Sequence, residues 1–183
     1  MRTHDKARSH TKLTTTLVLA AAALATLPVA LAQAGDGGIG TSSSQARPGK
    51  ARLVHGKAIA PSNAPARVVG VIDAANRIAK GRDYCYGGGH ASFKASCYDC
   101  SGSVSYALHG GHFLSRPMAS GDLMHWGRGH RGKWITVFAN SGHAYMTVAG
   151  LRFDTSMTRG TGPGWSRHMR SGAGYSKRHK GRF

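Results

Sequence analysis

The sequence contains no glutamate. All seven acidic residues are aspartates, and they face 25 lysines and arginines, which gives a formal net charge of +18. Enzymes that cleave glycosidic bonds commonly rely on a pair of carboxylates with glutamate as the acid, so this class loses support. A strongly positive field instead favours polyanionic surroundings, such as anionic lipid, nucleic acid or bacterial wall polymers.

Cysteine is also scarce, and the three that occur are Cys85, Cys97 and Cys100. The odd number means that at least one thiol has no disulfide partner within the chain. Cys85 and Cys97 can pair across a short loop and leave Cys100 free. The "CYDC" stretch also admits a redox pair, a zinc site built from Cys97, Cys100 and histidines, or an inert buried thiol at Cys100.

Only one long apolar run is present, "LTTTLVLAAAALATL" from Leu13 to Leu27. A basic segment precedes it and a small-residue cleavage site follows, which predicts a secretory signal peptide over residues 1–32. The alternative is an uncleaved anchor, but the run is short for a membrane span. Cleavage would leave a net charge of about +15 on a secreted, wall-associated protein with no stable membrane insertion.

The rest of the chain divides by composition. Residues 33–66 are rich in Gly, Ser, Ala and Pro and predict a flexible linker. Residues 67–183 predict one folded domain that ends in a basic, Gly-rich segment, 159–183. This last segment either adds a closing strand around Tyr175 or stays a solvated tail.

Hydrophobic periodicity predicts two helices followed by a strand meander. The first helix begins near Arg67 and stops at Gly81, and the second begins at Cys100 with Asp99 as its N-cap. The alternating residues around Tyr84 suggest a short strand between them. Three β-rich segments follow the second helix, at 133–139, 143–150 and 151–156. The expected fold class is α+β.

A cysteine at the start of a helix suits nucleophilic chemistry. The amide dipoles there favour a thiolate, and the free N–H groups can stabilise an oxyanion. The small residues Ser101 and Gly102 leave room for a substrate. The base would be His143, which opens an apolar strand after the "NSG" turn. Asp154 ends the next strand and could orient the imidazole.

At these residues the sequence resembles a known family. "YCYGGG", "YDCSGSVSYAL", "SGHAYMTVAG" and "FDTS" are similar to the NlpC-type cell-wall cysteine peptidases, a circularly permuted branch of the papain-like fold. The resemblance covers roughly residues 68–156. The segment "GDLMHWGRG" matches the family pattern only loosely, and the hairpin from His143 to Asp154 is short, so the chain resembles a divergent branch.

The resemblance implies a role for each matching residue. Cys100 would be the nucleophile, His143 the base and Asp154 the third polar residue, a position where the family more often has His, Asn or Gln. Tyr84 would help to hold the oxyanion, with Ser101 beside it in the substrate site.

The implied activity is hydrolysis of peptide or amide bonds in peptidoglycan stem peptides, by a monomer without metal or organic cofactor. Anionic wall polymers are expected as further partners, and nucleic acid is not. Two alternatives remain open. One is a non-catalytic basic wall-binding or polyanion-binding protein on the same scaffold, and the other is a thiol amidase or acyltransferase.

Overall fold

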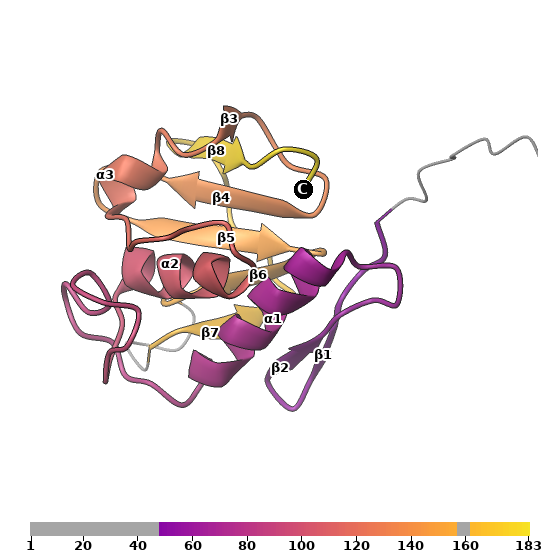
Figure 1. Ribbon diagram of the computed structural model, residues 1–183, viewed down its shortest axis with the longest axis horizontal. Coiled ribbons are helices and arrows are strands. Elements are labelled where there is room, and N and C mark those ends of the chain that lie inside the picture. Colours follow the sequence, from indigo (N-terminus) through magenta and orange to yellow (C-terminus); the bar gives the residue numbers. More distant parts are fainter. Residues whose placement is uncertain (1–47, 157–161) are drawn as a thin grey trace, which may run out of the picture. The chain divides into compact units, whose positions relative to one another are not determined.

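The computed structural model describes residues 48–156 and 162–183 (Figure 1). The expected signal peptide, and the linker up to residue 47, lie outside the described residues. Within them, no helix is both long and apolar enough to cross a membrane.

The domain combines two main helices with a six-stranded antiparallel sheet, so the α+β fold expected from the sequence is confirmed. The helices are α1 (Ala66–Ile78), α2 (Cys100–Gly110) and the single-turn α3 (Ser120–Leu123). The sheet has the order β3-β8-β4-β5-β6-β7. Its strands are β3 (Arg128–Gly129), β4 (Ile135–Ala139), β5 (Ala144–Val148), β6 (Leu151–Asp154), β7 (Gly164–Ser166) and β8 (Ser176–His179).

The helix α1 forms because apolar residues recur on one face, where Val68, Val71, Ile72 and Ile78 are buried. Pro65 precedes its first residue, a position at which a missing backbone N–H costs nothing. The chain leaves the helix at Ala79, which is extended.

Two glycines let α1 and α2 cross closely. A Cβ added at Gly70 would lie 2.5 Å from the carbonyl oxygen of Gly110, and one added at Gly110 would lie 2.3 Å from the Cβ of Ala74. Any larger side chain at either position would push the helices apart. This close crossing fixes α2 against α1 (Figure 1).

The central hairpin of the sheet joins β4 to β5, with Val137 opposite Met146 and Ala139 opposite Ala144. These residues belong to the buried core that includes the helices. Because side chains alternate across a strand, Phe138 and Tyr145 point to the other face, where their rings stack at 4.6 Å. Tyr175 covers Tyr145 on that face with an edge-on contact at 5.2 Å.

The sequence reading differs from the structure in two places. Residues 52–59, assigned to the linker, form a hairpin of β1 (Arg52–Val54) and β2 (Lys57–Ile59). Asn76 of α1 binds it through both backbone groups of Ala58, at 2.9 and 2.8 Å. The segment around Tyr84 is not a strand, because a turn of glycines follows it.

The structure also decides between the two readings of the C-terminal segment. The segment adds a closing strand directly after Tyr175, because β8 pairs with β4 and places Arg178 opposite Val137. Strand β7 likewise pairs with β6, with Trp165 opposite Phe153.

Candidate active site

Cys100 is the first residue of α2, and Asp99 caps the helix in front of it. The Asp99 Oδ1 atom accepts a hydrogen bond from the backbone N–H of Gly102 at 2.7 Å. The Cys100 side chain is buried and is the free cysteine of the chain. At this position the thiol lies near the aligned amide dipoles of the helix start, which favour an anion.

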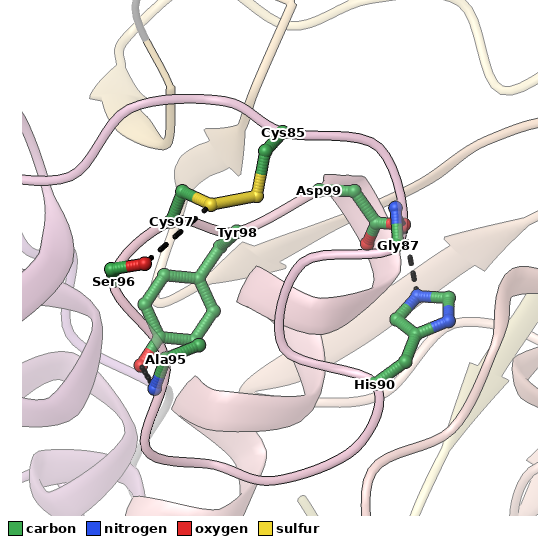
Figure 2. The surroundings of a disulfide bond; sticks show 8 residues. All are labelled: Cys85, Gly87, His90, Ala95, Ser96, Cys97, Tyr98 and Asp99. Atoms are coloured by element: carbon green, nitrogen blue, oxygen red, sulfur yellow. Dashed lines mark hydrogen bonds and ion pairs between the residues drawn. A yellow bond between two sulfur atoms is a disulfide. The ribbon is translucent and has the colours of Figure 1, made fainter.

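The other two cysteines are joined in a disulfide, Cys85 to Cys97, that closes the loop before α2 (Figure 2). Cys97 is therefore not available as a thiolate ligand or as a redox partner of Cys100. Among the described residues there is no group of three or more side chains suited to holding a metal ion.

Asp99 also holds this loop in place, as Figure 2 shows. Its Oδ2 atom accepts the backbone N–H of Gly87 at 3.2 Å and lies 2.9 Å from Nε2 of His90. The same His90 nitrogen lies 2.9 Å from the hydroxyl of Ser101, which donates to Asp99 Oδ1 at 3.2 Å. The carboxylate thus connects the loop to the first turn of α2.

His143 lies immediately before β5, and the turn in front of it is fixed by Asn140. The side-chain oxygen of Asn140 accepts the backbone N–H of Gly142 at 3.0 Å and that of His143 at 2.8 Å. Asp154 is the last residue of β6, which runs antiparallel to β5. Both side chains therefore lie at the same end of the sheet, where His143 Nε2 is 3.0 Å from Asp154 Oδ1.

Hydrogen bonds to Asp154 and then to Cys100 raise the pKa of His143 to about 9, against the opposing effect of its partial burial. Since Nε2 faces Asp154, Nδ1 is the nitrogen that remains for Cys100. The imidazole therefore links the carboxylate to the thiol in the order needed for a nucleophile, its base and an orienting group.

The carboxylate of Asp154 is fully buried and surrounded by donors. Oδ1 also accepts the backbone N–H of Ser156 at 3.0 Å, and Oδ2 accepts the Ser156 hydroxyl at 2.9 Å and Nη1 of Arg170 at 3.2 Å. Arg152 contributes a second guanidinium at 3.7 Å. Burial alone would raise the pKa of Asp154, but the hydrogen bonds from His143 and Ser156 lower it below its usual range.

A hollow of about 350 Å³ opens in front of Cys100. Tyr84, Tyr86 and His90 line it on the loop side, and Ser120 and Gly142 line it on the side of α3 and the β4–β5 turn. Burial, followed by the negative charges of Cys100 and Asp99, raises the pKa of the Tyr84 phenol. Its hydroxyl is therefore a neutral donor near the sulfur. None of the residues that line this hollow is Lys or Arg.

The structure brings together Cys100, His143 and Asp154, and it lines the hollow with Tyr84 and Ser101. Sequence reasoning missed two residues. His90 was overlooked because nothing in "GGGH" distinguishes it from the other ten histidines. Arg170 lies 16 residues after Asp154 in a basic segment, and no local pattern points to it.

No protein-family model matches the sequence, and no curated protein sequence matches it. Among solved structures, the peptidoglycan hydrolase RipB from Mycobacterium tuberculosis is similar with a TM-score of 0.49 and 25% identity, over 66% of this chain and 68% of that chain.

Two further structures are similar at lower identity. One is RipD from Mycobacterium tuberculosis, a non-catalytic NlpC/p60 domain protein adapted to peptidoglycan binding, with a TM-score of 0.46 and 18% identity over 63% of this chain and 98% of that one. The other is the P60 domain of an antigen from Mycobacterium avium subspecies paratuberculosis, with a TM-score of 0.42 and 18% identity over 61% and 93%. These structural neighbours are NlpC/p60 domain proteins.

Proposed function

We propose that this protein is a secreted cysteine peptidase that hydrolyses peptide or amide bonds in peptidoglycan stem peptides. The observation that carries the proposal is the chain of contacts from Asp154 through His143 to Cys100 at the start of α2. A carboxylate at 3.0 Å from Nε2 and a thiol at the other ring nitrogen are the parts that a thiol hydrolase needs.

The reaction begins from a thiolate and an imidazolium. A pKa of about 9 keeps His143 protonated at neutral pH, and a cation beside Cys100 favours the thiolate. Asp154 remains ionised because its pKa is lowered, so its charge stabilises the imidazolium and holds the ring in one orientation. Arg170 and Ser156 in turn hold the carboxylate in place.

In the first half of the reaction, the sulfur of Cys100 attacks the substrate carbonyl carbon, and the carbonyl oxygen becomes an oxyanion. Backbone N–H groups at the start of α2 and the Tyr84 hydroxyl are the donors nearest to it. The carbon–nitrogen bond then breaks as His143 gives its proton to the leaving amine. The products are a free amine and a thioester on Cys100.

In the second half, a water molecule gives a proton to His143 and attacks the thioester carbon. The carbon–sulfur bond breaks, the acid product leaves, and the thiolate and imidazolium are restored. Each step uses only protons and bonds of the substrate, water and this chain, so the residues need no redox partner.

The expected location and partners follow from the same proposal. A signal peptide over residues 1–32 would bring the protein to the cell wall, where stem peptides are found. The protein is expected to act as a monomer. The hollow has no Lys or Arg in its lining, so it suits a peptide better than a polyanion.

The proposal is tested by incubating the full chain with defined muropeptides and identifying the products by mass spectrometry. We expect free amine and carboxylate products from the wild-type protein, and none from the Cys100→Ala variant or after thiol alkylation. Circular dichroism checks that the variant is folded. Hydrolysis by folded Cys100→Ala would contradict the mechanism.

Product analysis and a binding assay together separate the two alternative functions. A product in which the acyl group is joined to an added amine would identify an acyltransferase. Binding to purified sacculi that survives alkylation of Cys100, with no released fragments from the wild-type protein, would identify a non-catalytic wall-binding protein.

A further inference from the structure

Basic side chains line two hollows that lie away from the candidate active site. The first, of about 340 Å³, lies between the loop before β4 and the C-terminal residues. Its basic lining residues are His130, Arg131, Lys133, His179 and Arg182. The second, of about 490 Å³, is lined on its basic side by Arg67, His109, His112 and Lys180.

The two hollows are neighbours. Lys180 lines the second hollow, while His179 on one side of it and Gly181 on the other line the first. His179 at the end of β8 and the four residues that follow it, 180–183, therefore form a ridge between the hollows. We name the two hollows and this ridge the basic end of the protein.

Two elements, α2 and β4, run from the candidate active site to the basic end, and the two sites lie at opposite ends of each. His109 is near the last residue of α2 and Cys100 is its first, so about 14 Å of helix separates them. Lys133 precedes β4 and Ser141 follows it, which separates the two ends by about 17 Å of strand. Figure 1 shows the C-terminus at the end of β4 that lies away from α3.

Several of these side chains are fixed by contacts that leave their charge in place. The Arg67 guanidinium binds the backbone oxygens of Gly111 and His112 and lies 3.9 Å from the ring centre of Phe113. Arg131 lies 5.0 Å from the ring centre of Phe138. A cation held against an aromatic ring keeps its charge and loses less freedom when it binds a ligand.

No acidic side chain balances this charge locally. None of the five aspartates among the described residues lines either hollow. Two of them, Asp99 and Asp154, are occupied at the active-site end by His90, His143, Arg152 and Arg170. The protein thus separates a hollow without Lys or Arg, at Cys100, from two hollows that no acidic side chain lines.

We propose that the basic end binds a phosphodiester polymer of the cell envelope, such as a polyol-phosphate chain. Exposed Arg131 and Arg182 supply planar guanidinium groups that can bind phosphate oxygens in pairs. Lys180, on the ridge between the two hollows, offers a charge to the next phosphate along a polymer. A single anion would fill one hollow, whereas a polymer can contact both.

The position of the basic end makes this binding compatible with chemistry at Cys100. A polymer held there leaves the hollow at the other end of α2 open, so it would concentrate the protein on the wall without competing for the peptide site. The inference is independent of the proposed peptidase activity, because it uses none of the residues around Cys100.

The test is a binding titration of the full chain on immobilised poly(glycerol phosphate) at several salt concentrations. We expect wild-type binding that weakens as salt rises, because phosphate contacts release counterions. The variant Arg131→Gln/Arg182→Gln should bind roughly tenfold more weakly at low salt, with a shallower dependence on salt. Cys100→Ala should bind as the wild type does.

The matched control is Arg52→Gln/Lys57→Gln, which removes the same charge from exposed positions on the β1–β2 hairpin. It should retain wild-type affinity. An equal loss in this control would mean that net charge alone drives binding, and the proposal would be overturned. Equal affinity for poly-L-glutamate, or tighter binding to a single-stranded oligonucleotide at equal phosphate concentration, would overturn the assignment to an envelope phosphodiester.

Discussion

His143 and Asp154 come from the opposite ends of two consecutive strands and meet at one end of the sheet, with Nε2 3.0 Å from Oδ1. The short β5–β6 connection makes this possible, because the antiparallel strands return the chain to the end where β5 began. The carboxylate is buried and the imidazole is partly exposed, so Asp154 can hold the ring in place while His143 stays accessible to a substrate.

The pair predicts the alkaline limit of activity. His143 stays protonated below its pKa of about 9, so the thiolate–imidazolium pair should be lost, and kcat/KM should fall, as the pH rises through about 9. Asp154→Asn removes the charge that helps to raise this pKa. The kcat/KM of this variant should therefore begin to fall at lower pH than that of the wild type. The measurement is kcat/KM on a muropeptide from about pH 5 to about pH 10. Asp73→Asn, on the exposed face of α1, is the control and should keep the wild-type profile. Coincident profiles for Asp154→Asn and the wild type would exclude this role.

Two neighbouring tyrosines allow a direct test of oxyanion stabilisation. Tyr84 and Tyr86 both line the hollow, and the charge of Cys100 contributes to the raised pKa of Tyr84. Tyr84→Phe should lower kcat by roughly 10- to 100-fold with little change in KM, because the hydroxyl acts on charge that develops in the transition state. Tyr86→Phe removes the same atom and should leave kcat unchanged. A similar loss in both variants would argue for a general effect on the loop.

Arg170 provides a test of how the buried carboxylate is stabilised. Its Nη1 lies 3.2 Å from Asp154 Oδ2, and it also covers the Tyr145 ring at 5.2 Å. A group with a lowered pKa contributes stability above its unfolded value, and this stability is lost as the pH falls through the folded value. Arg170→Ala should raise the pKa of Asp154 toward its unfolded value, because it removes a nearby positive charge.

The expected result is acid unfolding at higher pH than in the wild type, together with a loss of about 1 kcal/mol of stability at neutral pH. The measurement is urea unfolding at a series of pH values. Arg170→Lys keeps the charge and should recover part of the loss, while the exposed Arg116→Ala should behave as the wild type does. An unchanged acid transition in Arg170→Ala would show that the other donors to Asp154 are sufficient.

Gly102 tests the contact between the loop and α2. A Cβ at this position would lie 2.0 Å from the backbone oxygen of Gly88. Alanine normally stabilises a helix relative to glycine, by about 1 kcal/mol, but here the backbone of the loop would have to move. Gly102→Ala should therefore lower the free energy of unfolding by about 1–3 kcal/mol and reduce kcat/KM. Gly81→Ala, which lies outside the hollow and where an added Cβ would meet its nearest neighbours only at 4.0 Å, is the control in both assays.

The sequence was sufficient for the elements whose signals are local. The strands β4, β5 and β6 follow from runs of β-branched and aromatic residues, and the start of α2 follows from the capping residue Asp99. These elements also carry Cys100, His143 and Asp154. The approach of Asp154 to His143 could be anticipated, because adjacent antiparallel strands return the chain to the same end of a sheet.

The elements that the sequence did not reveal depend on distant partners. The residues of β8, "SKRH", show no apolar alternation, and the strand forms because β4 offers a free edge. Its Arg178 then binds the backbone oxygens of Trp126 and Gly127, at 2.8 and 2.9 Å, which are 52 and 51 residues away. His90 and Arg170 could not be found from the sequence for the same reason. Each acquires its role only when the fold brings an aspartate from another segment to it.

The four donors to Asp99 come from both the disulfide-closed loop and the first turn of α2. Opening of the loop would take two of these donors, Gly87 and His90, from the residue that caps the helix on which Cys100 sits. Because the amides of Gly87 and Gly102 both donate to Asp99, we expect them to behave as one cooperative unit in hydrogen exchange. Order in this loop and the position of the nucleophile are therefore coupled through one carboxylate.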